Sequence, residues 1–274
     1  MIKKIDKNNP IFISEDFQKD KYLFNTILKN LSSNALELYS DEENYILCRG
    51  RKDLQTWIWT KDNFDKSLLM EIEELINVYL TDNDKDKFTC KQELYQLLKY
   101  DNFTLLNDED YFEMSFMMCR ETHPTKRCDG NIYVPNIYDI ETLSDYYYDY
   151  SIKNGKDKIT KTEAFFRTRT LVEENRIYAW KNSQGKIVSM ASFSIIDNQA
   201  KLSNVYTITS ERRKGYARNL IYLLTEELIK EQFIPVMYIN NNTLPSTKLY
   251  LRIGYEKCGV LVNFSCSKNK IKKM

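Results

Sequence analysis

The chain has 274 residues, of which 42% are hydrophobic and 13% aromatic, and its 40 basic and 39 acidic side chains give a net charge of +1. This hydrophobic content excludes a disordered chain, and the near-zero net charge argues against a nucleic-acid partner. No apolar run approaches the ~18 residues that span a bilayer, and residues 1–6 lack the apolar core of a signal peptide. We therefore expect a cytoplasmic protein without a membrane partner, and its length suits two domains.

Few residues could support metal or nucleophile chemistry. The six cysteines are scattered without a C-x-x-C pair, which is typical of reduced thiols, and His123 is the only histidine. A zinc site or a histidine-dependent nucleophile would have to be built on that one residue. We expect no metal.

The first half of the chain has the apolar spacing and turn residues of an α+β domain. They predict a helix over 20–31, strands over 35–39, 45–49 and 54–59, a helix over 66–80, a charged linker over 82–87, a helix over 92–99, and strands over 103–106 and 111–119. Residues 121–130 then combine Pro124 and Gly130 with dense polarity. We place the domain boundary there, which gives domains 1–125 and 126–274.

The second half has the same mixed character. A strand is expected over 132–134, helices over 139–150 and 162–173, and strands over 176–180, 187–196 and 201–209. A helix that runs to Glu231, a strand over 235–239 and a short helix before Gly254 follow. We therefore predict a mixed α+β fold.

Cations gather where the helix ending at Glu231 begins. Arg212, Arg213 and Lys214 precede Gly215 there, although the partial positive charge of a helix N-terminus ordinarily favours acidic residues. A bound anion would explain these cations, because backbone N–H groups and basic side chains together can bind a phosphate. Gly215 would let the main chain approach that phosphate closely. The alternative is a solvated basic turn before a surface helix.

Two motifs carry a resemblance to a known family. Arg212 to Ala217 read R-x-x-G-x-A after a strand and at the start of a helix, and Tyr250, Gly254 and Tyr255 read Y-x-x-x-G-Y further on. The motifs G-x-x-x-x-G-K-[ST] and G-x-G-x-x-G are absent from this site. The order and separation of the two motifs resemble those of the GCN5-related N-acetyltransferases (GNAT), in a two-domain bacterial branch.

The resemblance implies tandem GNAT-like domains, each a mixed, mostly antiparallel sheet flanked by helices. No counterpart of the R-x-x-G-x-A loop occurs in the first half, and Gly50 is the only glycine before Gly130. The first domain is then interpreted as a degenerate acetyltransferase-like duplicate. An unrelated α+β cap is the alternative.

The resemblance also implies the site residues. Those expected to bind acetyl-CoA are Val205, Tyr206 and Thr207 for pantetheine, and Arg212, Arg213, Lys214, Gly215, Tyr216, Ala217 and Arg218 for the pyrophosphate loop. Tyr250 would be the general acid for the departing thiolate. Thr243 stands where many members have an asparagine, and the neighbouring Asn242 could substitute for it. The strand over 235–239 has no Asp or Glu, so no general base is named.

These residues predict an enzyme that moves an acyl group from acetyl-CoA to a small-molecule or peptide amine by direct transfer in a ternary complex. The sequence identifies neither the amine, the acyl chain length nor the oligomeric state. A first alternative is a CoA-binding regulatory module without turnover. A second is an aminoacyl-tRNA-dependent transferase, which the near-zero net charge disfavours because it would need a continuous basic surface.

Overall fold

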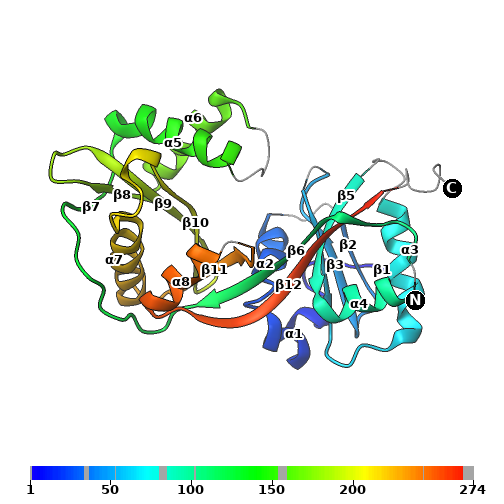
Figure 1. Ribbon diagram of the computed structural model, residues 1–274. Coiled ribbons are helices and arrows are strands. Elements are labelled where there is room, and N and C mark those ends of the chain that lie inside the picture. Colours follow the sequence, from blue (N-terminus) through cyan, green and yellow to red (C-terminus); the bar gives the residue numbers. More distant parts are fainter. Residues whose placement is uncertain are drawn as a thin grey trace. The chain divides into compact units, whose positions relative to one another are not determined.

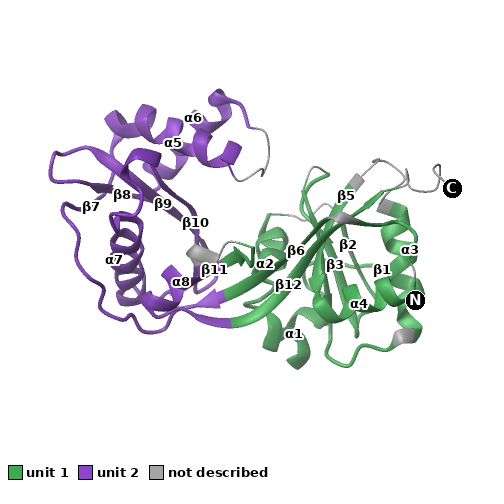
Figure 2. Cartoon of the chain, in the orientation of Figure 1, with its two compact units in different colours: residues 1–116, 238–243, 258–274 green, residues 117–237, 244–257 purple. Residues whose placement is uncertain are grey.

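The protein, described here as a computed structural model, folds into two compact units (Figures 1 and 2). The structure describes residues 2–33, 37–52, 54–79, 85–101, 103–153, 159–242 and 244–267. Unit 1 comprises residues 1–116, 238–243 and 258–274, and unit 2 comprises residues 117–237 and 244–257. The chain therefore passes between the units four times, whereas the sequence analysis placed one boundary at residues 125 and 126. As a division into sequence domains, that boundary stays a prediction.

Unit 1 is built on a mixed sheet with strands in the order β1-β2-β3-β4-β5-β12-β6. Neighbours from β1 to β4 are antiparallel, β4 and β5 are parallel, and β5 and β12 are antiparallel. Its elements are β1 (Lys3–Lys4), η1 (Pro10–Ile13), α1 (Glu15–Asp20), α2 (Asn25–Ser32), β2 (Glu37–Ser40), β3 (Tyr45–Arg49), β4 (Thr56–Thr60), η2 (Lys66–Leu68), α3 (Leu69–Tyr79), β5 (Lys85–Lys91), α4 (Gln92–Tyr100), most of β6 (Leu106–Met118) and most of β12 (Glu256–Ser267).

Both faces of the unit 1 sheet are covered, because successive residues of β3 enter different apolar clusters. Tyr45 and Leu47 pack with α3, α4 and β12, whereas Ile46 and Cys48 pack with η1, α1 and α2. This two-sided burial explains why β3 and β4 are buried throughout instead of alternating between buried and exposed positions.

In unit 2 the strands follow the order β7-β8-β9-β10-β11. Neighbours from β7 to β10 are antiparallel, and β10 and β11 are parallel. Figure 1 shows α5 and α6 on one face of these strands and α7 on the other. The elements are β7 (Asn131–Tyr133), η3 (Ile137–Asp139), α5 (Ile140–Lys153), α6 (Lys161–Glu173), β8 (Ile177–Lys181), β9 (Ile187–Ile196), β10 (Gln199–Thr207), η4 (Thr209–Glu211), α7 (Tyr216–Lys230), most of β11 (Ile234–Asn240) and α8 (Leu244–Ile253).

The two units repeat one order of elements. In each, three antiparallel strands are followed by a crossover helix, a strand parallel to the third, and a short helix: β2-β3-β4-α3-β5-α4 in unit 1 and β8-β9-β10-α7-β11-α8 in unit 2. The prediction of a mixed, mostly antiparallel sheet flanked by helices is confirmed. A repeated order of elements is what tandem domains require.

Several elements differ from the sequence prediction. The helix expected over 20–31 begins only at Asn25, as α2, and is preceded by α1, which ends at Asp20. The strands expected over 103–106 and 111–119 are replaced by the single strand β6, which begins at Leu106. Strand β5 begins at Lys85, within the charged linker expected over 82–87, of which residues 82–84 lie outside the described residues. The charged residues of this segment were wrongly predicted to form a linker, because Asp86 is in fact buried against the Arg49 guanidinium. Arg49 Nη2 and Asp86 Oδ1 are 3.1 Å apart. Strand β12 was not predicted.

Candidate functional site

Strand β10 leaves its parallel neighbour before it ends. The parallel ladder of β10 and β11 joins residues 199–201 to residues 234–236, and β10 continues to Thr207. On the β9 side the register shifts between Ser203 and Tyr206, and Asn204 has a left-handed φ of 51°. This is a β-bulge, a feature that redirects the strand end that follows it. Residues 205–207, expected to meet pantetheine, lie in this redirected end.

The turn after β10 leads into helix α7, whose N-terminus has no side-chain cap. Arg213 and Gly215 both have left-handed φ values, 65° and 93°, and Gly215 is the N-cap of α7 without a side-chain cap. The first turn of α7 has no acidic residue. A helix start of this kind leaves backbone N–H groups for an external acceptor, and a phosphate suits them. A Cβ on Gly215 would lie 3.2 Å from Arg218 Nη2, so this position is conformationally and sterically restricted.

The expected pyrophosphate ligands have different surroundings. Lys214 Nζ is paired with Glu211 at 2.8 Å, and Arg212 Nε donates to the Thr207 carbonyl at 3.1 Å. Arg213 is exposed and makes no hydrogen bond or ion pair within the described part of the chain. Its charge is therefore the most available for a ligand.

The remaining ligands expected on α7 lie in its first turn. Ala217 is half-buried, and Arg218 Nη2 donates to the Lys126 carbonyl at 2.9 Å. The Tyr216 ring is buried, and its hydroxyl donates to Asp129 Oδ1 at 2.8 Å. Burial and this carboxylate raise the pKa of Tyr216 to about 12. Because the Tyr216 side chain is buried and bonded to Asp129, the group of Tyr216 that could bind a ligand is its backbone N–H.

The segment 126–129 lies against the start of α7, which the sequence analysis missed because it interpreted residues 121–130 only as a domain boundary. The Lys126 carbonyl also accepts from Asn219 Nδ2 at 3.1 Å, and Cys128 Cβ would lie 3.8 Å from a Cβ on Gly215. The available signal was the pair Asp129 and Gly130, since Gly130 has φ 83° and Asp129 also accepts from the Ser183 N–H at 3.0 Å. The segment therefore forms part of the wall beside the helix start.

Tyr250 lies in α8 of the same unit. Its ring is buried and packs edge-on against Tyr255, with ring centroids 5.6 Å apart, and Tyr255 is in turn joined to Thr225 of α7 by a 2.8 Å hydroxyl contact. Burial raises the pKa of Tyr250, and the nearby Tyr150 of α5 adds to the shift. The Tyr250 hydroxyl forms no hydrogen bond within the described residues. It is a buried phenol kept protonated and available as a donor.

Other expected residues are placed less favourably. Val205 and Thr207 are half-buried, and Thr207 Oγ1 contacts Ser189 Oγ at 2.9 Å. Asn242 is exposed and belongs to the segment 238–243 of unit 1, so the structure does not group it with the rest of the site. Thr243 lies outside the described residues.

The described residues contain no group of three or more His, Cys, Asp or Glu side chains that could hold a metal ion. None of their helices has the length and apolar character needed to cross a membrane.

Comparison with known proteins agrees with the arrangement of unit 2. The sequence model of the acetyltransferase (GNAT) family matches residues 136–255, which include β10, the basic turn and Tyr250. The curated proteins contain no match to the chain.

Solved structures resemble the chain over nearly its full length. A GCN5-related N-acetyltransferase from Sphaerobacter thermophilus has a TM-score of 0.68 at 10% identity, over 97% of this chain and 94% of that one. One from Kribbella flavida has a TM-score of 0.61 at 11% identity, over 90% and 95%. A GNAT acetyltransferase from Colwellia psychrerythraea has a TM-score of 0.58 at 11% identity, over 97% and 100%. At these identities the likeness concerns the fold, and it is the family match that identifies residues 136–255 of this chain as a domain of the acetyltransferase (GNAT) family.

Proposed function

We propose that the protein is an acyl-CoA-dependent N-acyltransferase that moves an acetyl group from acetyl-CoA to a primary amine, carried by a small molecule or a peptide. The observation that carries the proposal is the uncapped start of α7, which follows a strand end that has left its parallel neighbour. Main-chain donors, the helix dipole and Arg213 together suit the diphosphate of coenzyme A.

Unit 1 supplies an internal contrast. At the equivalent point after β4, Asp65 Oδ1 accepts from the Ser67 N–H at 2.9 Å, so a carboxylate of the chain itself occupies the helix start. An anionic ligand would meet repulsion there instead of free donors. We propose that one unit of the two binds the coenzyme.

The chemistry is direct transfer in a ternary complex. The neutral amine attacks the thioester carbonyl carbon, a C–N bond forms, and the C–S bond then breaks. The leaving thiolate takes the proton of the Tyr250 hydroxyl, which water restores, and the nitrogen loses its extra proton to solvent. A backbone N–H at the end of β10 would stabilise the oxyanion.

A CoA-binding module without turnover is the second candidate, and one observation favours it. The position on β11 where some family members carry a carboxylate base holds Tyr238, which is half-buried and donates its hydroxyl to the Leu23 carbonyl at 2.8 Å. Strand β11 therefore offers no base. Either the amine arrives neutral or turnover is absent.

Calorimetry with CoA tests the proposal. We expect the wild type to bind CoA and Arg213→Asn to bind it roughly tenfold more weakly, which is about 1.4 kcal/mol, since asparagine keeps the left-handed backbone but removes the cation. Arg169→Gln, which alters an exposed arginine paired with Glu173 on α6, is the matched control and should bind as the wild type does. Absence of CoA binding by the wild type would refute both candidates. Binding without acetyl transfer to any of a panel of primary amines would favour the second.

A further inference from the structure

The end of β10 is held from helix α5. The Tyr206 side chain is buried, its hydroxyl donates to Asp149 Oδ2 at 3.0 Å, and it accepts from Lys153 Nζ at 3.0 Å. Asp149 and Lys153 are one helical turn apart on α5, and their charged atoms are 3.8 Å apart. A single phenol hydroxyl therefore joins the strand end to both side chains.

The same group extends to the basic turn. Lys153 Nζ also donates to Thr209 Oγ1 at 3.2 Å, and the Arg212 guanidinium lies 5.8 Å from the centre of the Tyr206 ring. Lys153 Nζ itself lies 5.2 Å from that ring centre. The Tyr206 ring is thus enclosed by two cations and by Tyr146 of α5, whose ring centre is 5.8 Å away.

This arrangement compensates for the ladder that β10 has lost. Beyond the pair Lys201 and Val236 the parallel ladder has ended, so after the bulge at Asn204 the strand end pairs with β9 alone, Tyr206 with Met190 and Thr207 with Ser189. The Asp149 and Lys153 side chains are about half exposed, at 54% and 45%, so they contribute little to the core. Both side chains instead hydrogen-bond to the hydroxyl of the buried Tyr206 at the strand end.

We propose that Asp149 and Lys153 are positioning residues for acyl transfer. They act through the Tyr206 hydroxyl to hold the backbone of residues 205–207 where the thioester carbonyl must lie. The inference rests on the proposed function. Because α5 also carries Tyr150 beside Tyr250, the same helix positions the strand end and borders the proposed acid.

The test compares Tyr206→Phe, Asp149→Ala, Lys153→Met and the double variant Tyr206→Phe/Asp149→Ala. We expect each to lower kcat for acetyl transfer about tenfold, measured as CoA thiol release with the best amine of the panel. The Kd of CoA, which has no acetyl group but whose pantetheine would meet the same backbone, should rise by a much smaller factor than kcat falls, by less than about threefold. The double variant should be no slower than Tyr206→Phe alone, since both changes remove one linkage. Lys153→Arg keeps a cationic donor and should restore most of the rate.

Asp145→Asn is the matched control, because Asp145 is an exposed carboxylate one turn earlier on α5. It should leave kcat unchanged. An equal loss in Asp145→Asn, additive losses in the double variant, or a parallel loss of CoA affinity would overturn the inference.

Amide hydrogen exchange separates this inference from the proposed function. In Tyr206→Phe and Asp149→Ala the amides of residues 205–208 should exchange at least tenfold faster, with no change in Asp145→Asn. A wild type without CoA binding or transfer would refute the proposed function while leaving this measurement valid. Unchanged exchange at residues 205–208 in the two variants would refute the positioning role, with or without turnover.

Discussion

At the scale of single residues, Tyr250 differs from the other tyrosines of unit 2 described above. The hydroxyls of Tyr206, Tyr216 and Tyr255 are each engaged with a neighbouring side chain, whereas that of Tyr250 has no partner among the described residues. The Tyr250 hydroxyl is therefore available to donate its proton to a ligand atom.

We expect Tyr250→Phe to lower kcat at least tenfold, which corresponds to about 1.4 kcal/mol of transition-state stabilisation, while CoA affinity stays unchanged. Phenylalanine keeps the edge-on packing on Tyr255 and removes only the hydroxyl. Tyr222→Phe, which removes a hydroxyl bonded to Glu226 of α7, is the control and should keep the wild-type rate. Steady-state kinetics with acetyl-CoA measure both, and a wild-type kcat in Tyr250→Phe would remove the residue from the mechanism.

The pH profile adds a second expectation for the same residue. Because burial raises the pKa of Tyr250, the protonated acid persists above the ordinary phenol value of about 10. We therefore expect kcat not to decrease with rising pH until the pH exceeds about 10. A fall in kcat near pH 8 to 9 that disappears in Tyr250→Phe would contradict this assignment.

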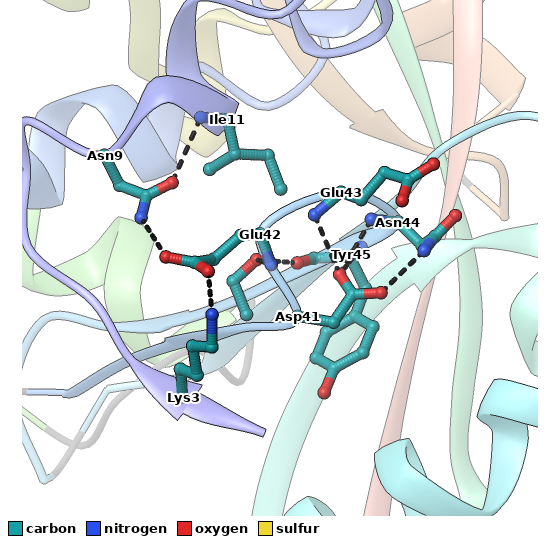
Figure 3. A network of polar contacts seen from close by, with 9 residues as sticks. Lys3, Asn9, Ile11, Asp41, Glu42, Glu43, Asn44 and Tyr45 are labelled. Atoms are coloured by element: carbon teal, nitrogen blue, oxygen red, sulfur yellow. Dashed lines mark hydrogen bonds and ion pairs between the residues drawn. The ribbon is translucent and has the colours of Figure 1, made fainter. Parts of the chain in front are cut away.

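At the scale of elements, the turn between β2 and β3 shows how one carboxylate organises a connection (Figure 3). Asp41 Oδ1 accepts from the backbone N–H groups of Glu43, Asn44 and Tyr45 at 3.1, 2.7 and 3.2 Å. Glu42 in turn bonds Lys3 and Asn9 and ties the N-terminal segment to the turn. Burial alone would raise the pKa of Asp41, but the hydrogen bonds outweigh it and hold the pKa below its usual value.

We expect Asp41→Ala to lower the unfolding free energy of unit 1 by about 1 kcal/mol at pH 7. This value already allows for solvent screening at the partly exposed turn. A lowered folded-state pKa stabilises the protein above the unfolded-state value of about 4, and this part is lost as pH falls through the folded-state pKa. The difference between variant and wild type should therefore shrink below pH 4. Urea unfolding at pH 7 and pH 3.5 measures it, with Glu43→Gln as a control that changes stability by less than about 0.5 kcal/mol.

At the scale of the whole molecule, each unit completes its sheet with chain from the other half of the sequence. Residues 261–267 of β12 pair with β5, although β12 follows the last helix of unit 2. Phe264 is buried there and stacks on Phe88, with ring centres 5.5 Å apart. In unit 2, the Cys119 N–H donates to the Pro235 carbonyl at 3.0 Å, so chain that follows β6 borders β11.

We expect Phe264→Ala to destabilise unit 1 by about 3–5 kcal/mol through the cavity that it leaves. Trp57 and Trp59 report on unit 1 and Trp180 on unit 2, so fluorine NMR of protein labelled with fluorotryptophan separates the two transitions. The signals of Trp57 and Trp59 should disappear at lower urea. Leu224→Ala in the buried face of α7 should act first on the Trp180 signal instead. A Phe264→Ala variant that shifts only Trp180 would contradict the assignment of β12 to unit 1.

Local sequence determined most of unit 2. The strands expected over 176–180, 187–196 and 201–209 are β8, β9 and β10 within two residues at each end, because β-branched and aromatic residues favour strands and turn residues separate them. The basic turn and the Tyr250 motif were likewise readable, since residue type and spacing set a helix start and a short helix. The bulge at Asn204 left no comparable pattern, because it depends on how two strands pair.

Only the tertiary structure decided the rest: that the segment 126–129 lies beside Gly215, that Tyr206 bonds Asp149 and Lys153, and that β12 joins unit 1. Periodicity reports which face of a segment is buried, and it contains no information about which distant segment buries it. Strand pairing and side-chain contacts between elements are long-range choices, settled by the packing of the whole chain.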